Sequence, residues 1–290
     1  MNKMYYILLY ITLKYMSVYK KIIVIGDIRG DSRVLFKSLE LANLVKDNKW
    51  IGKDTLVIQM GNTLSGKSTI SPPLSKEYKE TSDEIKIFNL LSLFESQARL
   101  HSCKIVSILG KHELLSYYYG NDKMFMQQYI KSKDEEIYKK MYNCSRNKFW
   151  RPGNDGGKLL SKRPLYILID KILFTNFNLS TGEKEINKSK EDVEKWLQTG
   201  KNKPDIISKE FNNVDTKLDF NLLNLNYKKI ITSNSIQDVN VINVKTDSSR
   251  AFGEEIQSLE ILEIITKPAL VIKRITEGKC KCKCKCTIEL

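Results

Sequence analysis

Three apolar segments of the chain each run directly into a short polar loop that begins with glycine. The apolar segments are 21–25, 54–60 and 104–109, and the loops that follow them read GDIRGD, GNTLSGKS and GKHE. In α/β folds, the carboxyl ends of neighbouring strands lie at one edge of the sheet, and binding sites form there. The sequence therefore predicts that the three loops meet in one functional site.

The segments between these strands have the spacing of amphipathic helices. Apolar side chains recur at helical intervals in 32–47 and again in 81–98. Ser32 and Asp31 are both candidates for the N-cap of the first helix. A strand, a helix and a second strand in succession make a βαβ unit.

The pattern changes beyond the third loop. Residues 114–150 predict a helical insertion rich in Tyr and Met, and the chain after residue 153 predicts strands at 165–169, 172–175, 229–232, 259–265 and 269–275. The predicted fold class is α/β, as an α+β sandwich with two central β-sheets flanked by helices. We expect an N-terminal extension over 1–20, one domain over 21–278 and a low-complexity tail over 279–290.

The loops resemble those of the calcineurin-like metallophosphoesterases, which read GDxHG, GDxxDRG and GNHE in the same order. Further segments resemble the bacterial and Shewanella-like protein phosphatase branch: WIGKDTLVIQMG at 50–61, FTNFNLS at 174–180, ITSNSIQ at 231–237 and SRAFG at 249–253. The resemblance implies the calcineurin-like fold, with 114–150 as its cap region. It also implies a chemistry in which two divalent ions, of Mn, Fe or Zn, activate a hydroxide that attacks a phosphate ester.

Most of the metal ligands that the resemblance implies are replaced. Asp27 matches the first ligand, but the second position is Arg29, a permanent cation. The bridging carboxylate is replaced by Asn62, the amide ligand by Lys111, and the two late imidazoles by Asn176 and Asn234. We therefore expect neither metal ions nor another cofactor at these positions.

His112 matches the family's proton donor to the leaving group. The Asp that would orient it is replaced by Ser65, and the neighbouring phosphate-clamping Arg by Gly66. We interpret His112 as a vestigial proton donor. The second histidine of the chain, His101, lies outside every motif and is expected at the surface.

The loop at 61–68 also satisfies the nucleotide-binding pattern GxxxxGKS. That pattern requires a helix that begins at Lys67 and continues, with its N-terminus against the phosphates. Pro72 and Pro73 follow soon after, and proline does not continue a helix interior. A P-loop is therefore the least favoured alternative.

The formal net charge of +14 admits anionic partners. The excess is mostly Lys spread along the chain, without an RNA-binding aromatic motif or zinc-finger spacing, so nucleic acid is not indicated beyond the charge itself. The apolar run at 5–13 is too short for a bilayer, which takes about 20 residues. We therefore expect an intracellular, cytoplasmic protein without a transmembrane segment. The abundance of Lys, Asn and Ile suggests an AT-rich genome, such as that of a virus whose protein acts in the cytoplasm of its host.

Cysteine usage agrees with a reducing compartment. Cys103 and Cys144 are isolated and suggest no disulfide framework. The remaining cysteines lie in KCKCKCKC at 279–286, where alternation puts the thiols on one face of an extended strand. This tail is either without a function of its own or a thiolate segment that binds zinc or copper(I) or oxidises.

The sequence thus predicts a pseudophosphatase that binds phosphorylated proteins or small phosphorylated ligands without hydrolysis. Arg29 and Lys111 place positive charge where divalent ions would lie, and Arg250 in SRAFG is a third candidate for phosphate binding.

Two alternatives stay open. One is a residual or metal-shifted serine/threonine-type protein phosphatase that works through Asp27, Asn62 and His112. The other is drift, in which the new cations are tolerated because Asp27 and Glu113 balance their charge.

Overall fold

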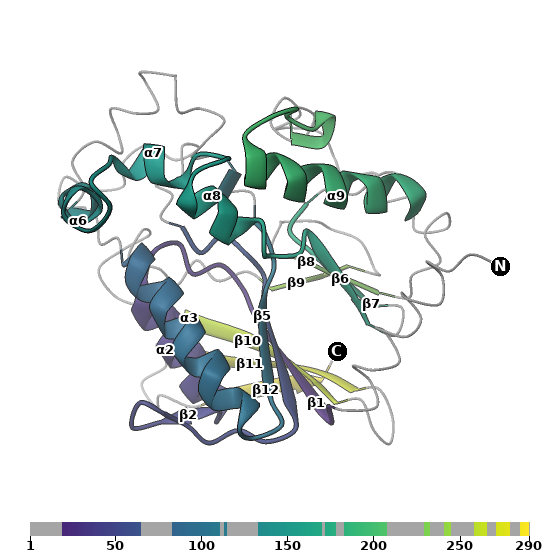
Figure 1. The fold of residues 1–290 in the computed structure, drawn as a ribbon. Helices are drawn as coiled ribbons and strands as arrows, with labels where there is room; N and C mark the ends of the chain where they lie inside the picture. The colour runs from purple at the N-terminus through teal and green to yellow at the C-terminus, as the bar shows by residue number, and fades with distance from the viewer. Residues whose placement is uncertain are drawn as a thin grey trace.

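The computed structural model (Figure 1) describes residues 19–64, 83–110, 113–114, 133–169, 172–177, 183–207, 229–232, 241–244, 258–265, 271–278 and 285–289. These residues form two β-sheets of six and four strands, together with a short hairpin. Helices flank the sheets (Figure 1). The predicted fold class, with two central sheets flanked by helices, is therefore confirmed.

The larger sheet combines parallel and antiparallel pairing. Its strands are β1 (Lys21–Ile25), β4 (Thr55–Gln59), β5 (Lys104–Ser107), β10 (Ser258–Ile265), β11 (Val271–Gly278) and β12 (Lys285–Glu289). Their order across the sheet is β12-β11-β10-β1-β4-β5. The neighbours β1, β4 and β5 run parallel, which requires crossover connections. The helices α2 (Ser32–Leu41) and α3 (Glu84–Arg99) lie in these connections.

The smaller sheet packs against one face of the larger one. It consists of β6 (Tyr166–Ile169), β7 (Ile172–Thr175), β8 (Lys229–Thr232) and β9 (Val241–Asn243), in that order. Along β1, Ile22 and Val24 contribute to the apolar core between the sheets, whereas Ile23 and Ile25 contribute to the core on the side of α2 and α3. Successive side chains of a strand point to opposite faces, so β1 is buried on both.

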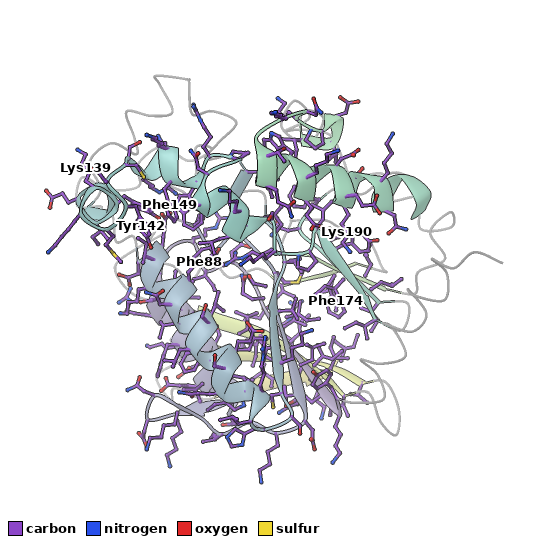
Figure 2. All side chains as sticks on the ribbon, in the orientation of Figure 1. Phe88, Lys139, Tyr142, Phe149, Phe174 and Lys190 are labelled. Atoms are coloured by element: carbon purple, nitrogen blue, oxygen red, sulfur yellow. The ribbon has the colours of Figure 1, made fainter. Side chains whose placement is uncertain are left out.

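The remaining helices are α6 (Lys133–Tyr142), α7 (Arg146–Trp150), α8 (Asp155–Leu160) and α9 (Glu183–Thr199). Figure 1 shows α9 along the smaller sheet, whereas α6, α7 and α8 lie on the side of α3. A third apolar cluster joins these helices to β6 and β7, and it includes Phe149 and Trp196. Figure 2 labels Phe149 in this outer cluster and Phe174 in the core between the sheets.

Of the two candidate N-caps of α2, Asp31 is confirmed, because its side chain accepts a hydrogen bond from the Arg33 N–H. The predicted end of this helix, at residue 47, needs correction. The helix ends at Leu41, since Asn43 has a left-handed backbone (φ 55°), and the chain continues into the hairpin of β2 (Val45–Lys46) and β3 (Lys49–Trp50).

The chain after residue 153 also differs from its prediction. It contains the helices α8 and α9 in addition to the predicted strands. Within the tail, Lys285–Glu289 forms β12 and pairs with β11. Much of the predicted cap insertion, at 115–132, lies outside the described residues.

Three smaller expectations can be checked. Cys103 and Cys144 are free, and His101 is exposed, as the sequence predicted. Among the described helices, none combines the length and apolarity that crossing a bilayer requires.

Candidate functional site

The loops that follow β1 and β4 are joined by backbone hydrogen bonds. The Arg29 N–H donates to the Asn62 carbonyl at 2.8 Å, and the Gly30 N–H donates to the Thr63 carbonyl at 2.9 Å. The Gln59 amide nitrogen, at the end of β4, donates to the carbonyls of Gly26 (3.1 Å) and Gly61 (2.6 Å). The parallel strands therefore bring these two loops together at one edge of the sheet.

Glu113 joins the third loop to the second. One of its oxygens, Oε2, accepts the N–H groups of Asn62 and Gly110, both at 2.9 Å. The other, Oε1, accepts the N–H groups of Thr63 at 2.5 Å and Leu64 at 3.1 Å, as well as the Thr63 hydroxyl at 2.7 Å. The carboxylate is 1% exposed. A buried anion thus holds the turn between Asn62 and Leu64.

The backbone at this edge is closely packed. Gly61 has φ 78°, and a Cβ atom there would lie 2.5 Å from the Gly110 nitrogen, so the position excludes a side chain. Arg29 (φ 47°) and Asn62 (φ 52°) are also left-handed. Left-handed backbone in residues other than glycine costs about 1–3 kcal/mol and tends to occur at functional sites.

Asp27, Arg29 and Asn62 form the polar centre of the site. The Nε atom of Arg29 donates a hydrogen bond to the Oδ2 atom of Asp27 at 3.1 Å. The Nη2 atom of Arg29 lies 3.0 Å from the same oxygen. The Asn62 amide nitrogen donates to the same oxygen at 3.0 Å. The side chain of Asp27 is 6% exposed and that of Arg29 is 14% exposed. Asp27, which the resemblance matches to the first metal ligand, is therefore paired with a guanidinium.

The described residues do not fit the two-metal centre that the family resemblance implies. A divalent ion at Asp27 Oδ2 would lie against the permanent charge of Arg29, and Asn62 presents an amide donor to that oxygen where a bridging carboxylate would be needed. Across the described part of the chain, no group of three or more His, Cys, Asp or Glu side chains is placed to hold a metal ion.

Asn176 lies close to this edge of the larger sheet. It is fully buried, and its amide nitrogen donates to the carbonyl of Met60 at 2.6 Å, two residues before Asn62. The other predicted site residues lie outside the described residues: Lys111, His112, Asn234 and Arg250, as well as Lys67 of the P-loop pattern.

Arg163, whose side chain is 9% exposed, is a residue of this region that the sequence motifs do not identify. Its Nη1 donates to the Thr63 hydroxyl at 2.7 Å and lies 3.8 Å from Oε1 of Glu113. Its guanidinium carbon lies 4.2 Å from the centre of the Phe88 ring. Burial lowers the pKa of Arg163 to about 10, although the charge of Glu113 acts in the opposite direction. In sequence it precedes a proline and an apolar strand, a context that carries no functional signal.

Known proteins resemble this chain in sequence and in fold. No protein-family model matches it. Shewanella-like protein phosphatase 1 of Plasmodium berghei (strain Anka) is 28% identical over 163 residues, which are 55% of this chain and 39% of the relative. The cold-active protein tyrosine phosphatase of a psychrophilic Shewanella species superposes with a TM-score of 0.60 at 16% identity, covering 93% of this chain and 80% of that one. A point mutant of a cold-active protein tyrosine phosphatase superposes with a TM-score of 0.61 at 15% identity. This match covers 93% of this chain and 80% of that one.

The two packed sheets and the three strand-end loops have the fold of these cold-active protein tyrosine phosphatases. In sequence, the chain is similar to Shewanella-like protein phosphatase 1, in agreement with the resemblance that its motifs indicated. The match spans 39% of the length of the curated relative.

Proposed function

We propose that this chain is a pseudophosphatase, which binds phosphorylated proteins or small phosphorylated ligands and does not hydrolyse them by a two-metal mechanism. The proposal is supported above all by the contact of Arg29 with Asp27. This contact supplies a fixed positive charge beside the acidic residue that would otherwise attract a metal ion. A guanidinium also has the geometry to bind a phosphate through two N–H groups.

The same contact determines how strongly phosphate can bind. Asp27 competes with an incoming anion for Arg29, whose side chain is 14% exposed. Arg29 alone is therefore expected to bind phosphate weakly. Lys111 and Arg250 are the further cations that the proposal assigns to the ligand.

The first prediction is that the protein does not contain the two metal ions of the family. Elemental analysis should be made on the chain truncated before Lys279, because the cysteines of the tail can bind zinc or copper independently. We expect less than stoichiometric manganese, iron and zinc, and no turnover of a generic phosphate ester. Even a change beside a metal ligand commonly lowers metal affinity or activity about 10–100-fold, so the loss of several ligands should abolish the centre.

A matched variant makes this measurement informative. Restoring the family's ligands in one chain, by Arg29→His, Asn62→Asp, Lys111→Asn, Asn176→His and Asn234→His, should raise the metal content of the truncated protein. Two equivalents of metal in the unmodified truncated chain, or strong turnover, would instead support the residual phosphatase that works through Asp27, Asn62 and His112.

The second prediction concerns the binding of phosphate groups. Titration with a phosphopeptide and a phosphosugar at low and moderate salt should show salt-dependent binding, which Arg29→Ala and Lys111→Ala each weaken about tenfold or more. Arg33→Ala is the matched control, because Arg33 also pairs with a neighbouring Asp, at 3.0 Å, but its side chain is 40% exposed. If neither substitution changes the binding, or if no binding occurs at millimolar ligand, the result would favour drift of the site over phosphate binding.

A further inference from the structure

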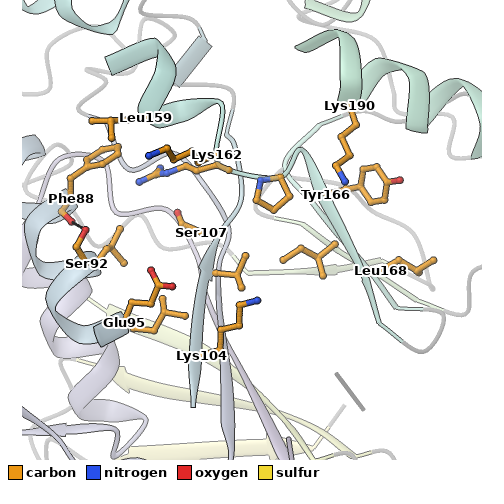
Figure 3. Close-up of a pocket in the computed structure, with 16 residues that line it drawn as sticks. Phe88, Ser92, Glu95, Lys104, Ser107, Leu159, Lys162, Tyr166, Leu168 and Lys190 are labelled. Carbon is orange, nitrogen blue, oxygen red and sulfur yellow. Dashed lines mark hydrogen bonds between the residues drawn. The ribbon is translucent and has the colours of Figure 1, made fainter. Parts of the chain in front are cut away.

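A groove separate from the Asp27 site lies between the two sheets. Its volume is about 620 Å³, and it is lined by α3, β5, β6, the chain that leads into β6, and Lys190 of α9 (Figure 3). Neither Asp27, Arg29 nor Asn62 is among its lining residues. We refer to it as the edge groove, because β5 ends the larger sheet and β6 ends the smaller one in the described strand order.

The backbone of β5 is suited to pair with another strand. Ile108 donates its N–H to Gln59 of β4, so alternate residues of β5 face β4. The intervening residues, Ile105 and Ser107, direct their N–H and C=O groups to the other side, where no strand pairs with β5 in the described structure. Leu109 continues this outward series, and its N–H donates to the Pro164 carbonyl at 2.8 Å.

The edge groove carries an excess of positive charge. Lys104, Lys162 and Lys190 line it, as does Arg163. The acidic residue in the described lining is Glu95, whose carboxylate already pairs with Arg99 at 2.5 Å. Figure 3 shows the three lysines at separate points around the groove, so they do not converge on a single phosphate-sized centre.

Apolar side chains contribute the rest of the lining, among them Phe88, Leu91 and Ile167. A four-residue strand such as β5 is about 13 Å long, at about 3.3 Å per residue. The groove therefore combines the unpaired backbone edge of β5, a wall of apolar side chains and cations that are spaced apart. Together these features match an extended chain in which acidic and apolar side chains alternate.

We infer that the edge groove docks an extended acidic segment of a partner protein, which adds to β5 as a further strand. The outward backbone of Ile105 and Ser107 provides the hydrogen bonds. The apolar wall receives alternate side chains of the segment, and Lys162 and Lys190 receive the acidic ones. This docking uses neither Arg29 nor Lys111, so it is independent of the phosphate binding proposed above.

The test uses the full chain and a labelled eight-residue peptide that alternates Glu with Val. We expect salt-dependent binding, and slower hydrogen exchange at the Ile105 and Ser107 amides when the peptide is bound. N-methylation of alternate peptide residues, which removes the pairing N–H groups, should weaken binding about tenfold or more. The double substitution Lys162→Glu and Lys190→Glu should do the same, whereas Lys46→Glu on the exposed hairpin should change it less than about twofold.

Other outcomes would overturn the inference. Equal binding of the N-methylated peptide, or of a peptide with its glutamates in one block, would reduce the interaction to charge attraction alone. Inorganic phosphate and single-stranded RNA would be added at the same concentration of negative charge as the peptide. If either one displaces the peptide, the groove binds a different class of ligand. An absence of binding at millimolar peptide would exclude docking. Arg29→Ala should leave peptide binding unchanged, which separates this result from the fate of the phosphate proposal.

Discussion

Replacing Glu84 with alanine should lower the free energy of unfolding by about 3–5 kcal/mol. Glu84 is fully buried at the start of α3, and it accepts hydrogen bonds from Nε and Nη2 of Arg146 at 2.8 and 2.5 Å. The Arg146 side chain is itself only 4% exposed. Deleting the carboxylate removes the counter-charge of a buried guanidinium, which is far more costly than losing an exposed ion pair. Urea denaturation of the purified variant measures the effect.

The buried pair belongs to a wider polar cluster between helices. The Tyr138 hydroxyl donates to Glu84 at 2.9 Å and accepts the Trp150 indole N–H at 2.6 Å. Burial, and secondarily the charge of Glu84, raises the pKa of Tyr138, so its hydroxyl stays protonated and continues to donate. Through these contacts Glu84 connects α3 to α6 and α7.

Two variants control for this prediction. Arg99→Ala breaks an ion pair with Glu95 whose arginine is 70% exposed, and it should change stability by less than about 1 kcal/mol. Replacing Glu84 and Arg146 together with methionine should recover part of the loss, since no charge then remains buried. A loss below about 1 kcal/mol for Glu84→Ala would mean that water reaches Arg146 in the variant and that the pair contributes little.

The sequence predicts the strands of this fold better than its later helices. The bounds of β1, β7 and β8 match their predictions, because short apolar runs end at clear polar boundaries. By contrast, α9 has a narrow apolar stripe, with Val193, Trp196 and Leu197 buried in an otherwise polar helix. Such sparse periodicity is a weak signal for a helix that tertiary packing stabilises.

The candidate site was predictable in its location but not in its contacts. Glycine-led loops after parallel strands indicated correctly that Asp27 and Asn62 lie together. No sequence pattern indicates that Arg29 turns back to contact Asp27, because that depends on the left-handed turn at Arg29 itself. Arg163 was missed because it reaches Thr63 from 100 positions away in the chain.

Replacing Glu113 with glutamine should lower the free energy of unfolding by about 2–4 kcal/mol and loosen the turn that holds Asn62. The reason is that both carboxylate oxygens accept backbone N–H groups in a site with 1% exposure. Hydrogen bonds to a charged group contribute about 1.5–3 kcal/mol each, and the glutamine NH₂ would face donors that need an acceptor.

Hydrogen exchange distinguishes this local effect from a general loss of stability. In Glu113→Gln, the amides of Asn62, Thr63 and Leu64 should exchange faster than those of β1, whereas Glu84→Ala should accelerate exchange around α6 and α7 first. Unchanged protection of Asn62 through Leu64 would show that Arg163 and the Thr63 hydroxyl hold the turn without Glu113.

If the turn does loosen, phosphate binding that depends on Arg29 should weaken as well, because the Arg29 N–H is anchored to the Asn62 carbonyl at 2.8 Å. A buried carboxylate that binds no ligand would then control the geometry of the cation proposed to bind one.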